Sequence, residues 1–264
     1  MTDFGARYLD KALGIWGQID PSAEKYFPIG SRVFAANLPN KFIDPDGREI
    51  DVTGMDVYSQ VQLLLSLSRI TGNNIKIEEG KVVNKGKGSM EGSPKAGIFL
   101  DYLISSPQIM YVKSTYSGGS NNKQEKGRVN ISLDTYQIEE TFQTLGETQG
   151  WGLTFLHEAL HTGWAAVHFD KEKYDGFEDP VNDKHPNYDP NAIGDTETVV
   201  NQFRKELKLV ERSSYFNINH YSFDGRLINT TWKFGNKDVE IKPINRLPLF
   251  DKIIRSGLSK LNNL

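Results

Sequence analysis

Residues 153–163 read LTFLHEALHTG, and residues 157–161 of this stretch match the pattern HExxH. On an α-helix, residues four apart lie on one face, so the imidazoles of His157 and His161 can converge on one tetrahedral ion at about 2.0–2.1 Å. Glu158 lies roughly a quarter-turn away, where it suits a general base for an activated water better than a third ligand. The pattern therefore predicts a zinc-dependent hydrolase that uses these three side chains.

The residues around the motif predict a helix with one packed face. Leu153, Leu156 and Leu160 recur at helical spacing, and Gly163 predicts an end or bend directly after the second histidine. With five histidines in 264 residues, the motif arises by chance on the order of one time in a hundred or less. The alternative is a surface helix that carries two solvated histidines.

A catalytic zinc ion also needs a third protein ligand. The longer pattern HExxHxxGxxH requires glycine at 164 and histidine at 167. In this chain the glycine stands at 163 and the histidine at 168, so each is one position off. A straight helix would place His168 about 10 Å along the axis from His161, whereas a break at Gly163 lets the chain return. His168 and Asp170 are the predicted candidates for the third ligand. Loop or helix-cap roles are expected for Asp179, His185, Asp195 and Glu197.

A second helix is predicted after Gly194. It carries the spaced apolar residues Val200, Phe203 and Leu207. Asp195 or Thr196 is its expected N-cap, Glu197 falls in its first turn, and it should pack under the site. Farther on, the phenol of Tyr215 is a candidate hydrogen-bond donor to a developing oxyanion. An ordinary half-buried tyrosine is the alternative for that position.

The remaining pattern predicts an α+β fold with a small mixed sheet and a β-rich C-terminal region. Helices are expected from Val57 to Gly72, with Asp56 as cap and Val61, Leu64 and Leu65 on the apolar stripe, and at 97–104. Strands are expected at 74–77, 81–83, 109–113 and 129–133, with a polar loop at 117–122. A hairpin should bracket Asp224-Gly225 within 221–231, with Trp232 and Phe234 packing it, His220 structural, and a terminal helix at 249–261.

Composition excludes several classes of function. The net charge is −3 with mixed signs, which argues against a nucleic-acid-binding surface, and Lys81, Lys85 and Lys87 are expected in a solvated loop. No apolar run approaches the ~20 residues of a membrane span, and the amino terminus lacks a signal-peptide core. Cysteine is absent, so no disulfide is needed. If the protein leaves its cell, another component must export it.

Residues 1–48 carry a separate set of motifs. They include DFGAR at 3–7, LGIW at 13–16, DP at 20–21, AEKY at 23–26 and DPDGR at 44–48. In this order the motifs resemble the carboxy-terminal end of the RHS-repeat-associated core domain. Lys11 and Ile15 depart from that pattern. Arg48 stands where self-cleaving members continue to leucine, so cleavage through Asp44 and Asp46 is not expected.

That resemblance implies a division into an RHS remnant at 1–48 and a toxin domain at 49–264. RHS proteins are secreted or surface-delivered bacterial toxins in which a β-rich shell encloses a variable carboxy-terminal toxin. The resemblance thus implies delivery from a bacterial cell, an RHS shell if the chain is part of a longer one, and a cognate immunity protein. The remnant itself should form a few strands and turns but no closed sheet of its own.

Residues 49–264 resemble zincin-type toxin domains in HEALHTG at 157–163, NQFRKEL at 201–207 and RSSY at 212–215. The resemblance implies zinc bound by His157 and His161, Glu158 as base, and a protein or peptide substrate. Two alternatives stay open. One is a non-catalytic RHS-derived interaction module with a vestigial motif. The other is a metal-dependent amidase that acts on a non-peptide substrate such as the cell wall.

Overall fold

A computed structural model of the chain describes residues 50–106, 109–125, 128–162, 193–215, 217–246, 248–251 and 253–254, and the backbone alone of 2–3, 8–10, 15–16 and 49. The contacts divide the chain into two units, Met1–Gly47 and Arg48–Leu264. In the first unit, β1 (Thr2–Asp3), β2 (Tyr8–Asp10) and β3 (Ile15–Trp16) pair antiparallel in the order β1-β2-β3. This segment therefore does form a small sheet of its own, against expectation.

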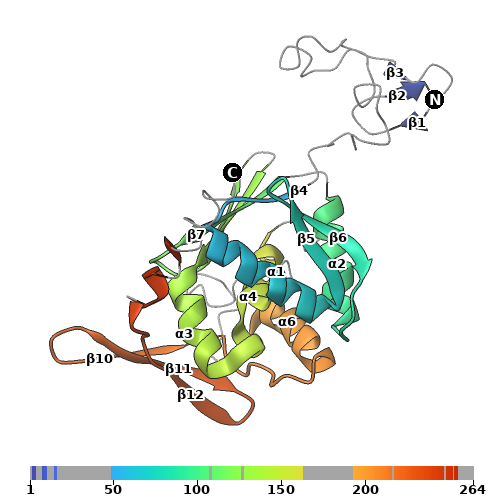
Figure 1. Ribbon diagram of the computed structural model, residues 1–264. Coiled ribbons are helices and arrows are strands. Elements are labelled where there is room, and N and C mark those ends of the chain that lie inside the picture. Colours follow the sequence, from blue (N-terminus) through green and yellow to red (C-terminus); the bar gives the residue numbers. More distant parts are fainter. Residues whose placement is uncertain are drawn as a thin grey trace. The chain divides into compact units, whose positions relative to one another are not determined.

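The second unit is built on a six-stranded mixed sheet in the order β5-β6-β4-β7-β9-β8 (Figure 1). Its strands are β4 (Glu49–Gly54), β5 (Asn73–Glu78), β6 (Lys81–Lys87), β7 (Ile109–Thr115), β8 (Asn121–Glu125) and β9 (Arg128–Asp134). The pairs β4–β7 and β7–β9 are parallel, and the other pairs are antiparallel. β8 lies at one edge of the sheet.

The helices of this unit are α1 (Val57–Thr71), α2 (Pro94–Ser105), α3 (Thr135–Leu145), the 3₁₀ turn η3 (Gly146–Gln149), α4 (Trp151–Leu160) and α6 (Gly194–Glu206). Alternate residues of the central strands are fully buried, which gives the sheet one continuous apolar face. These residues are Ile50, Val52, Met110, Val112, Val129, Ile131 and Leu133. α1, α2 and α4 each contact the sheet, and α1 also contacts α2 and α4, so the second unit has an α+β architecture.

Helix α1 begins and ends where the sequence predicts. Asp56 caps it by accepting a hydrogen bond from the Ser59 amide at 2.9 Å, and Gly72 ends it with φ of 70°. The predicted apolar stripe is wrong in part, because Val61 is 44% exposed and Leu65 is 52% exposed. A neighbouring stripe of Leu63, Leu67 and Ile70 is buried instead. Both stripes have helical spacing, so only packing against α4 and the sheet decides which of the two is buried.

Three local predictions for this unit need correction. Lys81, Lys85 and Lys87 lie in strand β6 and not in a solvated loop. The predicted loop at 117–122 runs into strand β8, whose sequence NNKQE lacks the β-branched and aromatic residues that mark strands. As an edge strand, β8 forms through main-chain pairing with β9 alone. Helix α3, capped by Asp134, was not predicted either.

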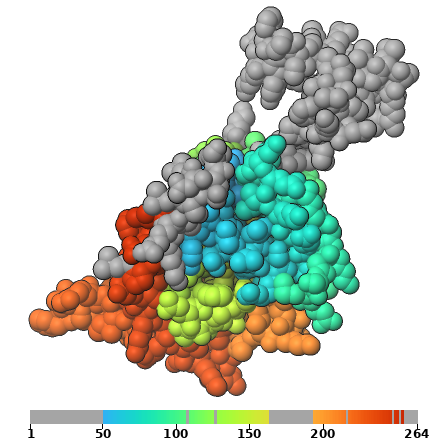
Figure 2. All heavy atoms as spheres, viewed as in Figure 1, coloured from blue at the N-terminus to red at the C-terminus, as the bar shows by residue number. Residues whose placement is uncertain are grey.

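The C-terminal region is a three-stranded antiparallel sheet of β10 (Ile218–Tyr221), β11 (Leu227–Phe234) and β12 (Lys237–Ile241). The predicted hairpin at Asp224-Gly225 is confirmed, and it projects from the unit (Figure 2). Trp232 and Phe234 are buried and pack together with Ile241, as expected. His220 Nε2 lies 2.8 Å from Thr231 Oγ1, in keeping with a structural role.

Helical backbone continues through residues 248–251 and 253–254, and the rest of the predicted terminal helix lies outside the described residues. In the part of the chain that the structure describes, no helix is long and apolar enough to cross a membrane.

Replacing Gly152 with alanine should destabilise the second unit by about 1–3 kcal/mol, because the contact between α1 and α4 leaves no room for a methyl group. A Cβ there would lie 2.7 Å from Ile70 Cδ1 and 3.2 Å from the main-chain carbon of Ser66. Thermal unfolding followed by circular dichroism measures the effect. The matched control is Gly97→Ala in α2, where a Cβ would meet nothing closer than 3.4 Å. Equal melting temperatures for the two variants would contradict this prediction.

Candidate metal centre

The motif lies on α4, which is a core helix and not a surface one. Every residue of α4 except His157 is buried, and the predicted stripe of Leu153, Leu156 and Leu160 lies in the main hydrophobic core. His161 follows as the C-cap residue with helical backbone angles. The alternative of two solvated histidines on a surface helix is therefore wrong. His157 and His161, both partly buried, lie instead at the C-terminal end of this otherwise buried helix.

The two imidazoles converge through their Nε2 atoms, which lie 3.2 Å apart. The rings are nearly perpendicular, with an interplanar angle of 79°. Two nitrogens that share one tetrahedral ion at about 2.0–2.1 Å are separated by about 3.3–3.4 Å. The observed separation therefore fits a zinc ion bound between His157 and His161.

The opposite nitrogens of both rings face partners on α6. His157 Nδ1 lies 3.0 Å from Glu197 Oε2, although the carboxylate is off the direction of the ring N–H, so this contact is mainly electrostatic. His161 Nδ1 lies 3.3 Å from Thr196 Oγ1. The carboxylate beside His157 favours the tautomer with its proton on Nδ1, which leaves the Nε2 lone pair for a metal. The Thr196 hydroxyl can accept from Nδ1 of His161 in the same tautomer. Glu197 thus orients a ring, a role that its place in a helix's first turn did not predict.

Glu197 is completely buried, and two guanidinium groups balance its charge. Arg204 donates to Glu197 Oε1, and Arg212 Nη1 lies 3.4 Å from Oε2. Burial alone would raise the pKa of Glu197, but Arg204, Arg212 and His157 together hold that pKa well below its usual range. Arg204 also donates to Thr148 O, Asn201 Oδ1 and Gln149 Oε1, each at 2.8 Å. The carboxylate is therefore fixed as an anion beside His157.

Glu158 faces the edge strand of the sheet. Its side chain is nearly buried at 7% exposure, and Oε2 accepts a hydrogen bond from Asn122 Nδ2 of β8 at 3.2 Å. This contact places the edge strand beside the candidate general base. Asn122 lies in the stretch that the sequence marked as a loop, so no pattern pointed to it.

Tyr215 completes the group of side chains at the centre. Its hydroxyl lies 3.2 Å from His161 Nε2, and its ring centroid is 5.9 Å from that of His157. The structure therefore brings Tyr215 to the same point as the two histidines, 54 residues along the chain from His161. The hydroxyl is directed at His161, and its role at a developing oxyanion stays a prediction beside the alternative of a half-buried tyrosine.

The predicted third-ligand candidates His168 and Asp170 lie outside the described residues, as do Asp179 and His185. Among the described residues, no group of three or more histidine, cysteine, aspartate or glutamate side chains is placed to hold an ion. Ile193, and not Asp195 or Thr196, is the N-cap of α6, while Asp195 and Glu197 occupy its first turn. The third ligand therefore stays a prediction.

Sequence reasoning did not identify most of the supporting residues on α6. Glu197, Asn201 and Arg204 recur at i, i+4 and i+7, parallel to the apolar stripe of Val200 and Phe203, and all five are buried. A polar stripe with helical spacing beside an apolar one was the available signal. It indicates a helix that buries a hydrogen-bonded network and not only a hydrophobic face.

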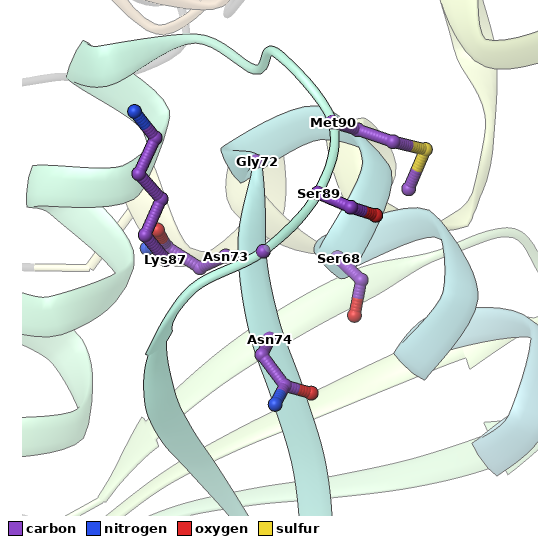
Figure 3. Close-up of a pocket in the computed structure, with 8 residues that line it drawn as sticks. Ser68, Gly72, Asn73, Asn74, Lys87, Ser89 and Met90 are labelled. Atoms are coloured by element: carbon purple, nitrogen blue, oxygen red, sulfur yellow. The ribbon is translucent and has the colours of Figure 1, made fainter.

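A pocket of about 410 Å³ lies elsewhere in the second unit (Figure 3). It is lined by Ser68, Gly72, Asn73, Asn74, Lys87, Gly88, Ser89 and Met90, where the end of α1 meets β5 and the residues after β6. Neither α4 nor α6 contributes to it. Among the described residues that line it, Lys87 alone is charged, and none belongs to the group around His157 and His161.

Comparisons of the chain with protein-family models, with curated proteins and with solved structures find no match.

Proposed function

We propose that residues 49–264 form a zincin-type metallopeptidase domain that hydrolyses peptide bonds. The observation that carries the proposal is the convergence of His157 and His161 at 3.2 Å between their Nε2 atoms, with Nδ1 of each ring facing α6. His157 and His161, with His168 or Asp170 as third ligand, would hold a zinc ion there, and such an ion would act as a Lewis acid on a carbonyl and lower the pKa of a water molecule toward about 7.

Glu158 serves in this proposal as the general base. Its carboxylate accepts the proton of the attacking water and then passes it to the leaving amine. Asn122 holds one oxygen of that carboxylate and so limits its rotation. The hydroxyl of Tyr215 donates a hydrogen bond to the carbonyl oxygen as negative charge develops on it. These roles require Glu158 and Tyr215 at one site with the two histidines. Glu158 follows His157 directly on α4, and the Tyr215 hydroxyl lies 3.2 Å from His161 Nε2.

The position of β8 favours a peptide as substrate. β8 pairs with β9 on one side and ends the sheet on the other, so its outer edge can pair with an extended peptide. Asn122 lies on this strand and contacts Glu158, so a peptide bound along β8 runs past the general base. A short carbohydrate-linked amide would pair less well with such an edge, because strand pairing needs an extended main chain.

The biological setting that we propose rests on the sequence of residues 1–48. The motifs that resemble an RHS core support a bacterial toxin or effector that is secreted or delivered into a target cell. A cognate immunity protein in the producing cell would then block the site. The proposed immunity protein is tested by co-expression of the chain with its neighbouring gene product, followed by a test of complex formation.

The function is tested by zinc content and hydrolysis together. The wild-type chain should bind about one zinc ion, whereas His157→Ala and His161→Ala should each lose the metal and the activity, because three protein ligands become two and two-point coordination is far weaker. Elemental analysis and cleavage of a labelled peptide library measure both. His220→Ala is the matched control, since His220 is exposed and contacts Thr231.

Two results would overturn the proposed function. If the wild-type chain binds no zinc when zinc is supplied, the non-catalytic interaction module becomes the better interpretation. Preferential cleavage of cell-wall fragments over peptides would assign the same residues to an amidase.

A further inference from the structure

Tyr215 lies at the end of the segment 211–215, which has no helical residue and only one β-bridge. The position of its side chain therefore depends on how that segment is held. One side of the segment pairs with the end of β11 through a bridge between Arg212 and Phe234. Ser213 N donates to Lys233 O at 3.0 Å, and Gly235 N donates to Glu211 O at 2.8 Å. Strand β11 thus fixes one edge of residues 211–213.

The other edge is held by one side chain of α6. Asn201 Nδ2 donates to the carbonyl oxygen of Arg212 at 2.7 Å, and Asn201 Oδ1 accepts from the Arg212 amide at 2.8 Å. The side-chain amide therefore makes the pair of hydrogen bonds that a neighbouring strand would make. Arg204 Nη1 also donates to Oδ1 at 2.8 Å, which fixes the orientation of the amide because a flip would set donors against donors.

The side chain of Arg212 connects this restrained segment to Tyr215. Its Nε donates to Ser214 O at 2.8 Å, and its Nη2 donates to Tyr215 O. The guanidinium lies 4.3 Å from the centre of the Trp232 ring, so the side chain is also held by β11. A shift in the main chain of Arg212 would therefore move the carbonyls that it binds, and with them the Tyr215 hydroxyl.

We propose that Asn201 is a positioning residue that sets the distance from the Tyr215 hydroxyl to the metal site. This inference rests on the proposed function, in which Tyr215 acts on the developing oxyanion. Asn201 is 6% exposed and its side chain binds Arg204 and Arg212, so it acts on the reaction through the residues that it holds and not by touching a substrate. Aspartate at this position keeps the acceptor for Arg204 but loses the donor to Arg212 O.

The test is a double-mutant cycle between Asn201→Asp and Tyr215→Phe. Asn201→Asp should lower kcat roughly ten- to a hundredfold, with KM changed less than about threefold and the zinc content unchanged, because a small misplacement of a catalytic group is costly. In the Tyr215→Phe background the same change should cost less than about twofold. An equal loss in both backgrounds would overturn the proposal, since Asn201 would then act on something other than Tyr215.

Gln149→Glu is the matched control, because Gln149 also binds Arg204 but does not touch Arg212. Hydrogen exchange of residues 211–215 gives a readout that needs no enzymatic activity. The amides of residues 211–215 should exchange faster in Asn201→Asp, because the segment loses the hydrogen bond to the Arg212 carbonyl, and at the wild-type rate in Gln149→Glu. Unchanged exchange in Asn201→Asp would also overturn the proposal, whether or not the wild-type chain cleaves peptides. If Asn201→Asp does not fold, Asn201→Ser serves in both measurements.

Discussion

Replacing Glu158 with glutamine should lower peptide hydrolysis by about 10²–10⁴-fold or more, while the bound zinc stays. Glutamine has the shape of glutamate but cannot accept the proton of the attacking water. Its amide oxygen can still accept the hydrogen bond from Asn122 Nδ2, so the nearly buried side chain keeps its place. Steady-state cleavage of a labelled peptide and elemental analysis of the same preparation measure the two quantities.

Glu139→Gln is a matched control for that variant. Glu139 is also a nearly buried carboxylate on a helix next to α4, and its Oε1 accepts a hydrogen bond from Trp151 Nε1 at 2.8 Å. It lies outside the metal centre, so we expect wild-type hydrolysis from this variant. Activity retained by Glu158→Gln would reject the assignment of the general base, and loss of its zinc would mean that Glu158 is a ligand.

Replacing Glu197 with glutamine should destabilise the second unit by about 3–5 kcal/mol, because Arg204 and Arg212 would stay buried without a counter-charge. Both guanidinium groups are almost completely buried. For a unit of this size the loss corresponds to a fall in melting temperature on the order of 10 °C. Thermal and urea unfolding of the metal-free protein measure the effect without a contribution from bound zinc.

The same variant should bind zinc about 10–100-fold more weakly, because Glu197 orients His157. A competition titration with a chromogenic chelator measures this at a temperature where the variant is folded. Asp195→Asn is the control on the same helix turn and should cost less than about 1 kcal/mol, the usual value of a charge at a helix N-terminus. If Glu197→Gln unfolds with the wild-type midpoint, Arg204 and Arg212 do not depend on this carboxylate.

Strong local signals account for the elements that the sequence predicted correctly. Asp56 and Gly72 bound α1, and Asp224-Gly225 joins β10 to β11, because capping and tight turns depend on a few neighbouring residues. β8 was missed since an edge strand needs only a partner for its main chain and not an apolar side-chain pattern. The buried face of α1 was predicted wrongly because two apolar stripes compete on it.

The sequence by itself determined the pair of histidines and the glutamate next to them. Four-residue spacing on one helix fixes their relative positions through local geometry alone. It also determined that α4 has an apolar stripe and that a second helix follows. Tertiary structure alone decided that Glu197 touches His157 and that Asn122 touches Glu158. It alone directed Tyr215 at His161. Those contacts join residues 35 or more positions apart, and no periodicity encodes which distant side chain fills a given place.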